Sequence, residues 1–127
     1  KIKPNAIGKT LVLKADPSTK LGASKGLVIV LIPGNKNLDK NKFKKAGKFK
    51  KIDFISEAVM KNKFKGFKMG AIPPFGGLFG LAAFVEGTLL KEKNIFVNAG
   101  VYEMSLKLSP KVFEKLGLIK GSFSKAK

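Results

Sequence analysis

Hydrophobic residues along the chain fall into short runs of strand length, each closed by turn-forming residues. Runs rich in Val, Ile, Leu and Phe occupy residues 10–14, 26–32, 49–55, 81–85 and 94–98. Residues 102–108 alternate apolar and polar side chains, which is the period of a strand buried on one face. The pattern predicts β-strands in these places. We expect the strands at 10–14, 26–32, 81–85, 94–98 and 102–108 to share one curved sheet.

Three further segments carry helix signals. Residues 37–47 place apolar side chains among lysines and end at Gly47, a pattern typical of a short amphipathic helix. Ser56 is a candidate N-cap for a second helix. Ser109, followed by proline, opens a third helix that ends at Gly117.

The remaining segments complete the expected fold. Residues 86–87 read as a turn, residues 89–90 as the start of another short strand, and the tail from Lys120 as frayed, because it has few hydrophobic residues. At about 150 residues per domain, a chain of 127 residues is one domain, residues 1–127. The predicted fold class is α+β: a single domain with a curved, mixed, barrel-like β-sheet flanked by short helices.

Composition narrows the possible chemistry. The chain has no cysteine and no histidine, which excludes disulfides, thiolate metal sites and imidazole general bases. No apolar run approaches the roughly 18 residues of a membrane span, and no signal peptide precedes the first strand. The sequence begins with lysine, so we expect a fragment of a longer product. Any catalysis must use lysine, carboxylate, hydroxyl, backbone groups or the substrate itself.

The net charge of +18 points to polyanionic partners, nucleic acid first and anionic membrane second. Every cation is lysine, which favours contact with phosphates over the reading of base edges. An AT-rich genome would also favour lysine over arginine, but it would not explain the shortage of acids. Residues 36–68 hold twelve lysines and three acids. We expect nucleic-acid contacts here, from Lys44, Lys45, Lys48 and Lys50, although a merely solvated face is the alternative.

Three local features could carry chemistry. Lys9 and Thr10 open the first strand, residues 66–80 are dense in glycine and proline, and a turn follows Asn98. Glycines let backbone N–H groups approach an anion or oxyanion closely. Each feature also has a structural explanation, namely a solvated lysine, a surface loop and an ordinary turn.

Together and in this order, five stretches resemble the YbaK family, the prolyl-tRNA-synthetase-associated editing domain. They are GKTLVLKAD (8–16), LVIVLIPGNKNL (27–38), GFKMGAIPPFG (66–76), IFVNAG (95–100) and SLKLSP (105–110). The resemblance implies an aminoacyl-tRNA deacylase that hydrolyses misacylated tRNA in trans, most often tRNA for proline carrying a wrong, smaller amino acid such as Cys or Ala. It also implies a cytoplasmic protein that acts on the acceptor end of tRNA, with prolyl-tRNA synthetase as a possible partner. No cofactor, metal or membrane is required.

The resemblance assigns roles by position. Lys9 matches the family's functional lysine, and Gly70 begins the glycine-to-proline loop whose backbone N–H groups would stabilise an oxyanion, so these two are the catalytic candidates. The expected substrate contacts are Thr10, Ala71, Ile72, Pro73, Pro74, Asn98, Gly100 and Ser105. Ser105 departs from the aspartate frequent in the family, and the helical segment that the family carries before its first strand is absent.

Two other functions remain open. The first is a non-catalytic tRNA-binding module on the same fold, with Ser105 marking lost activity. The second is a small basic nucleic-acid-binding protein of ribosomal type. The apolar runs at residues 27–32 and 77–85 argue against the second, because they imply a substantial core.

Overall fold

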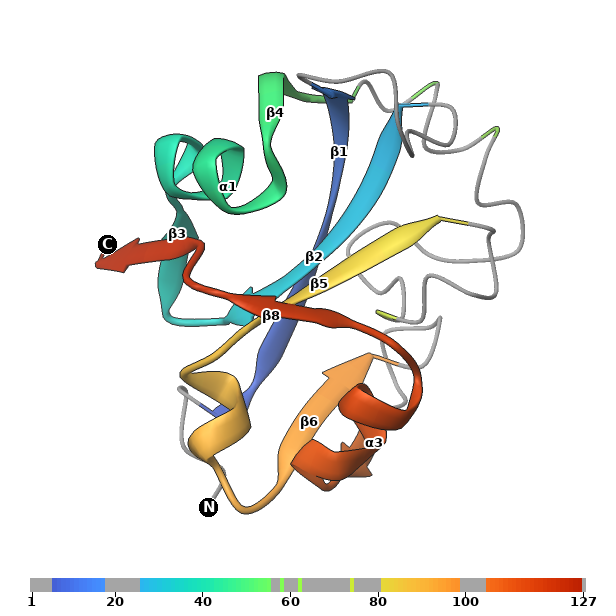
Figure 1. Ribbon diagram of the computed structural model, residues 1–127. Helices are drawn as coiled ribbons and strands as arrows, with labels where there is room; N and C mark the ends of the chain where they lie inside the picture. The colour runs from blue at the N-terminus through green and yellow to red at the C-terminus, as the bar shows by residue number, and fades with distance from the viewer. Residues whose placement is uncertain are drawn as a thin grey trace.

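The computed structural model describes residues 6–17, 26–55, 81–98 and 105–126, and the single positions Ala58, Asn62 and Pro74 (Figure 1). The largest sheet has the strand order β4-β1-β2-β5-β8. Its strands are β1 (Gly8–Pro17), β2 (Leu27–Pro33), β4 (Phe49–Phe54), β5 (Ala82–Glu86) and β8 (Ile119–Gly121). Two smaller sheets pair β3 (Lys36–Leu38) with β9 (Ser124–Ala126), and β6 (Ile95–Asn98) with β7 (Ser105–Leu108). The helical elements are α1 (Lys40–Gly47), α3 (Pro110–Lys115) and the 3₁₀ turn η3 (Leu89–Lys91).

The large sheet is mixed, which confirms the predicted α+β class. β1 runs antiparallel to β2 and β4, whereas β2 with β5 and β5 with β8 are parallel. Over the described ranges this sheet is open, so the barrel-like closure is not confirmed. The expectation that 94–98 and 102–108 join the other strands in one sheet is wrong. β6 and β7 pair with each other, and within the described residues their backbone bridging to the rest of the fold is an isolated parallel bridge between Phe96 and Ile7, the residue before β1.

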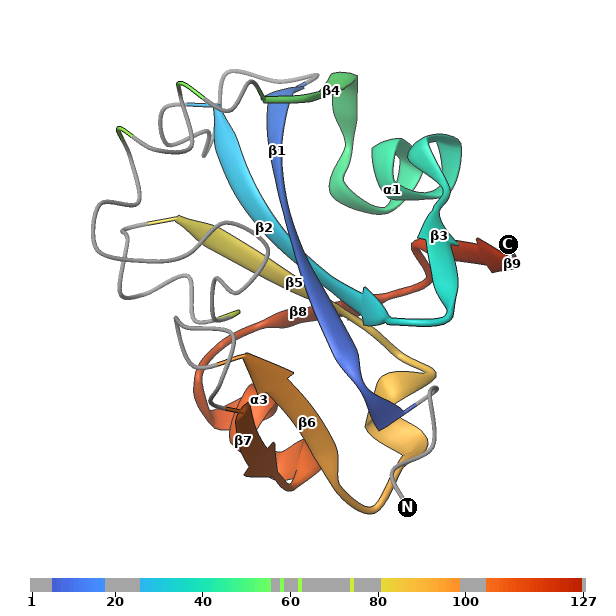
Figure 2. The same ribbon diagram turned by 180° about the vertical axis from the view of Figure 1, so that it is seen from behind.

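Two hydrophobic cores cover the two faces of the large sheet, and we call them core A and core B. Core A lies under β6, α3 and η3, and includes Val12, Leu31 and Val97. Core B includes Leu13 and Phe43. The elements on its side of the sheet are α1, β3 and the C-terminal segment (Figures 1 and 2). β2 is buried on both faces, which explains its continuous apolar run.

Helix α1 forms where its pattern predicts. The Asp39 carboxylate accepts a hydrogen bond from the Lys42 amide at 3.1 Å, so it caps the first turn. Phe43, the buried residue of this helix, packs edge-on against Phe84 and Phe123, with ring centroids 4.9 and 5.2 Å apart. This aromatic group fixes the helix on the sheet and leaves its lysines toward solvent.

The expectation of a frayed tail from Lys120 is wrong. β8 pairs with β5, β9 pairs with β3, and Phe123 between them is fully buried. One buried aromatic ring and two strand pairings anchor a segment that composition alone describes as polar. Leu89 is likewise buried in η3 rather than in a strand.

Helix α3 begins at Pro110 as expected, with Phe113 buried, and Gly117 follows it with a positive φ of 77°. Ser109 occupies the N-cap position, but its side chain makes no capping hydrogen bond. The helix expected from Ser56 falls largely outside the described residues. No helix in the described part of the chain is long and apolar enough to cross a membrane.

Candidate functional site

The first expected site residues lie where β1 starts, beside β6. The parallel bridge at Ile7 and Phe96 sets the register between the two strands. Lys9 and Asn98 each follow their bridge residue by two positions, about 7 Å along the strand at 3.3 Å per residue. The chain therefore brings two residues almost ninety positions apart to the same level of neighbouring strands.

Lys9 and Thr10 lie on opposite faces of the sheet. In the antiparallel ladder Lys9 pairs with Ile32 of core B, and Thr10 pairs with Leu31 of core A. Directly opposed residues share a face. Thr10 therefore lies on the face that β6 covers, whereas the half-buried Lys9 lies on the face of α1.

The hydroxyl of Thr10 is the most informative atom of this region. Its Oγ1 is buried, and in the described part of the chain it makes no hydrogen bond. A buried hydroxyl without a partner costs about 1–3 kcal/mol, so native structures rarely keep one without a reason. A ligand that supplied a donor or acceptor here would relieve that cost.

Asn98 and Ser105 meet across a strand pair. They stand directly opposite each other at the open end of the β6–β7 ladder, where β6 ends and β7 begins. Together with the bridge between Ile7 and Phe96, this pairing puts Lys9 on β1, Asn98 on β6 and Ser105 on β7 at one level, with Thr10 one position further along β1 and on the face opposite Lys9. We call this group the β1–β6–β7 site.

Of the other expected substrate-binding and catalytic residues, the structure describes one. Pro74 is described and buried. Gly70, Ala71, Ile72, Pro73 and Gly100 lie outside the described residues.

The expected nucleic-acid contacts gather around α1 and β4. Lys44 and Lys45 line a surface hollow of about 450 Å³ together with Asn41 and the half-buried Phe49. The pairing of β4 with β1 shifts register between Asp16 and Pro17 and skips the exposed Lys50. This bulge lets both Phe49 and Ile52 reach core B although they are three positions apart.

Two further lysines of this surface have particular positions. Lys48 ends α1 in the left-handed conformation, with φ 57°. The Lys42 ammonium donates to the Ser124 carbonyl at 3.0 Å, so this lysine helps to hold β9. Lys42 thus contributes a contact within the fold, whereas other lysines of α1, such as Lys45, are exposed to solvent.

Sequence reasoning missed Glu86. Instead of marking a turn, this residue is 3% exposed at the end of β5. One carboxylate oxygen accepts from the backbone N–H groups of Phe123 and Ser124, at 2.6 and 3.0 Å, and the other accepts from the Thr88 hydroxyl at 3.2 Å. The only sequence signal is an acid directly after an apolar strand, and that pattern equally suits a turn.

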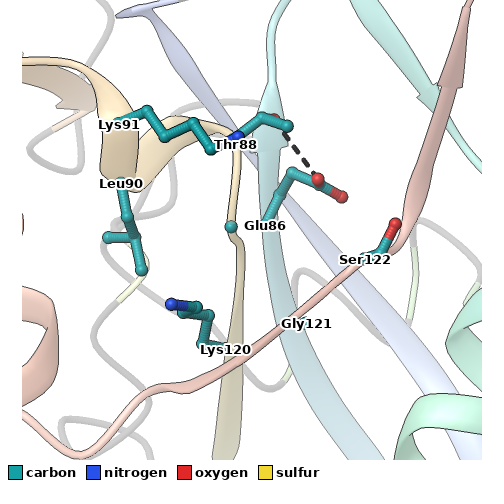
Figure 3. A pocket seen from close by; sticks show the side chains of 8 residues that line it. Glu86, Thr88, Leu90, Lys91, Lys120, Gly121 and Ser122 are labelled. Atoms are coloured by element: carbon teal, nitrogen blue, oxygen red, sulfur yellow. Dashed lines mark hydrogen bonds between the residues drawn. The ribbon is translucent and has the colours of Figure 1, made fainter.

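A surface pocket of about 300 Å³ opens beside Glu86 (Figure 3). Its walls come from η3 and the turn before it and from the β8 segment, with Leu90, Lys91 and Lys120 among them. The Glu86 carboxylate is already occupied by three donors, so it anchors the C-terminal segment rather than serving as a free acid or base.

Comparison with known proteins identifies the class. The model of the aminoacyl-tRNA editing domain family matches residues 1–116. The chain therefore belongs to this family. No curated protein is similar enough in sequence to be recognised as a relative.

Solved structures share the fold. The crystal structure of hypothetical protein APE2540 is 25% identical with a TM-score of 0.78, over 98% of this chain and 77% of that one. A proposed trans-editing enzyme for prolyl tRNA synthetase is 21% identical with a TM-score of 0.78, over 98% and 73%. A proposed signal transduction protein from Marinobacter aquaeolei is 13% identical with a TM-score of 0.76, over 97% of this chain and 26% of that chain.

Proposed function

We propose that this domain is an aminoacyl-tRNA deacylase that hydrolyses misacylated tRNA in trans. The observation that carries the proposal is the buried Thr10 hydroxyl at the β1–β6–β7 site, which has no hydrogen-bond partner among the residues that the structure describes, in a chain of the aminoacyl-tRNA editing domain family. The proposed substrate is tRNA for proline carrying a small wrong amino acid such as Cys or Ala. The fold shared with a proposed trans-editing enzyme for prolyl tRNA synthetase supports this choice.

The reaction demands little from acid or base side chains. A water oxygen bonds to the ester carbonyl carbon, the bond to the terminal ribose oxygen breaks, and that oxygen takes up the proton that the water loses. The products are the free amino acid and tRNA with an intact terminal hydroxyl. Because the ester is already activated, positioning of the water and stabilisation of the oxyanion supply most of the catalysis. A protein without histidine or cysteine can provide both.

Thr10 is assigned to positioning. A threonine hydroxyl stays protonated at neutral pH, and it donates one hydrogen bond and accepts two. On the β6 face it would hold the attacking water or the ammonium group of the wrong amino acid. Gly70 and the loop up to Pro74 would supply the backbone N–H groups that stabilise the oxyanion. Asn98, Gly100 and Ser105 would close the other side.

Lys9 is assigned to the nucleic acid. Lysine side chains attract phosphate and, at their ordinary pKa, are poor bases. Because Lys9 lies on the face opposite Thr10, we assign it to a terminal phosphate of the tRNA rather than to the reacting carbonyl.

A panel of charged tRNAs tests the function. tRNA for proline is charged separately with Pro, Cys, Ala and Ser, and release of the labelled amino acid is followed with and without the protein. Selective hydrolysis of a mischarged species, with Pro-tRNA spared, is the expected result. If no charged tRNA is hydrolysed but uncharged tRNA still binds, the domain is a non-catalytic binding module and the proposal is wrong.

A further inference from the structure

Phe54 is an aromatic side chain in an unusual place. It ends β4, an edge strand of the large sheet, and it is 58% exposed. Its partner across the ladder, Leu13, is fully buried, so Phe54 continues the face of core B beyond the edge of the core. A single exposed apolar side chain is common on protein surfaces, so the exposure of Phe54 by itself indicates no function, and the groups around the ring decide its meaning.

A lysine accompanies this ring. The Lys40 ammonium at the start of α1 lies 5.0 Å from the centroid of the Phe54 ring, within the range of a cation–π contact. The first residue of α1 and the last residue of β4 thus present a cation and an aromatic ring side by side.

The surroundings of the pair are positive. Residues 36–55 contain eight lysines and two aspartates, a net charge of +6. Both aspartates are engaged within the protein, since Asp39 caps α1 and Asp53 lies 3.6 Å from the Lys51 ammonium. The other large hydrophobic side chains exposed in the described residues, Ile7, Leu116 and Ile119, belong to other elements. A single ring among lysines is suited to bind a polyanion that carries flat apolar groups. It is less suited to bind a partner with an extended apolar surface.

We propose that Phe54 and Lys40 form a stacking site for an unpaired nucleotide of tRNA, with the base against the ring and a phosphate against the ammonium. This inference rests on the proposed function, which makes tRNA the bound molecule. Stacking on exposed aromatic side chains is a general way to hold unpaired bases, whereas a base within a duplex is covered on both faces by its neighbours. The site adds a contact that discriminates paired from unpaired nucleotides, which the surrounding lysines alone do not.

Binding of uncharged RNA tests the site without any need for hydrolysis. Fluorescence anisotropy measures the Kd of the full chain for uncharged tRNA, for a short unstructured RNA and for a blunt RNA duplex. Phe54→Ala should weaken binding of the unstructured RNA roughly 5- to 150-fold, the usual range for loss of one stacked base. Phe54→Tyr should retain wild-type affinity. Leu116→Ala, which truncates a side chain of similar exposure on another element, is the matched control and should change nothing.

Salt dependence separates the two partners of the site. Lys40→Gln should reduce the slope of log Kd against log salt by about 0.7, the value for one phosphate contact with a single strand. Phe54→Ala should leave that slope unchanged, because stacking releases no counterion.

Several results would overturn the inference. Wild-type affinity of Phe54→Ala for unstructured RNA is one, and an equal loss for the blunt duplex is another. Phe54-dependent binding to phosphatidylserine vesicles, without any effect on RNA, would assign the ring to a membrane instead. If Phe54→Ala fails to fold by circular dichroism, Phe54→Leu keeps the apolar bulk without the aromatic face and should show the same loss. A chain that hydrolyses no charged tRNA yet shows Phe54-dependent RNA binding would remove the proposed function and support this site.

Discussion

Replacing Thr10 by valine should raise stability and lower activity at the same time. The substitution exchanges the buried Oγ1, which lacks a hydrogen bond in the described part of the chain, for a methyl group of almost the same shape. Valine also suits the position, because Thr10 lies in a strand and on the face of core A. The two opposite effects have one cause, a hydroxyl that costs stability in the free protein and is used only when substrate is bound.

The magnitudes follow from that hydroxyl. Leaving it buried and unpartnered costs about 1–3 kcal/mol, so Thr10→Val should unfold at a higher urea concentration. The free energy of unfolding should rise by about 1 kcal/mol, the lower end of that range, because the surrounding residues partly relax around the hydroxyl. If the same hydroxyl holds a water or an ammonium group in the transition state, its loss should lower kcat/KM about 10- to 100-fold. Thr10→Ser keeps the hydroxyl and should retain most activity.

Urea titration and deacylation of the best mischarged tRNA are measured on the same preparations. A stabilised Thr10→Val with full activity would show that the hydroxyl has no substrate partner. A destabilised Thr10→Val would contradict the starting point, since it would mean that the hydroxyl contributes to the fold.

Three further predictions concern other parts of the molecule. Glu86→Ala should destabilise the fold by about 3–5 kcal/mol in urea unfolding, because it leaves two buried N–H groups without an acceptor, whereas Glu86→Gln should cost only about 1–2 kcal/mol; equal costs would contradict the anchoring role. Lys9→Ala should raise KM more than it lowers kcat, since its ammonium is assigned to a phosphate, and the reverse pattern in steady-state kinetics would place it at the reacting carbonyl. Neutralising four lysines together should lower the slope of log Kd against log salt for tRNA by about 3, while kcat at saturating tRNA stays largely intact. An unchanged affinity would show that these lysines are only a solvated face. These four are Lys44, Lys45, Lys48 and Lys50.

Much of the fold could be predicted because its signals are local. β2 is an apolar run buried on both faces, and β7 is an alternating run whose apolar side chains pack on one face. Helix α1 has its cap, its single buried Phe43 and its end within about ten consecutive residues. Such features depend on contacts between near neighbours, so the order of residue types is sufficient to place them.

The candidate site was only partly accessible from the sequence. The order of motifs singled out Lys9, Thr10, Asn98 and Ser105, which lie on β1, β6 and β7, strands connected by one bridge and one ladder. The alternation of a strand already puts Lys9 and Thr10 on opposite faces. Which of these faces β6 covers depends on pairing between residues almost ninety positions apart, and no local pattern contains that information.

What the sequence determined by itself is the strand and helix content, the positive charge and the family motifs. The tertiary structure decided the rest. It buried Glu86 under a C-terminal segment that looks polar and placed β6 and β7 in a sheet of their own. It also left the Thr10 hydroxyl without a hydrogen bond to any described residue and Phe54 more than half exposed. Each of these outcomes is set by which distant segment packs against the residue, and burial and hydrogen bonding are properties of that packed neighbourhood rather than of the residue type.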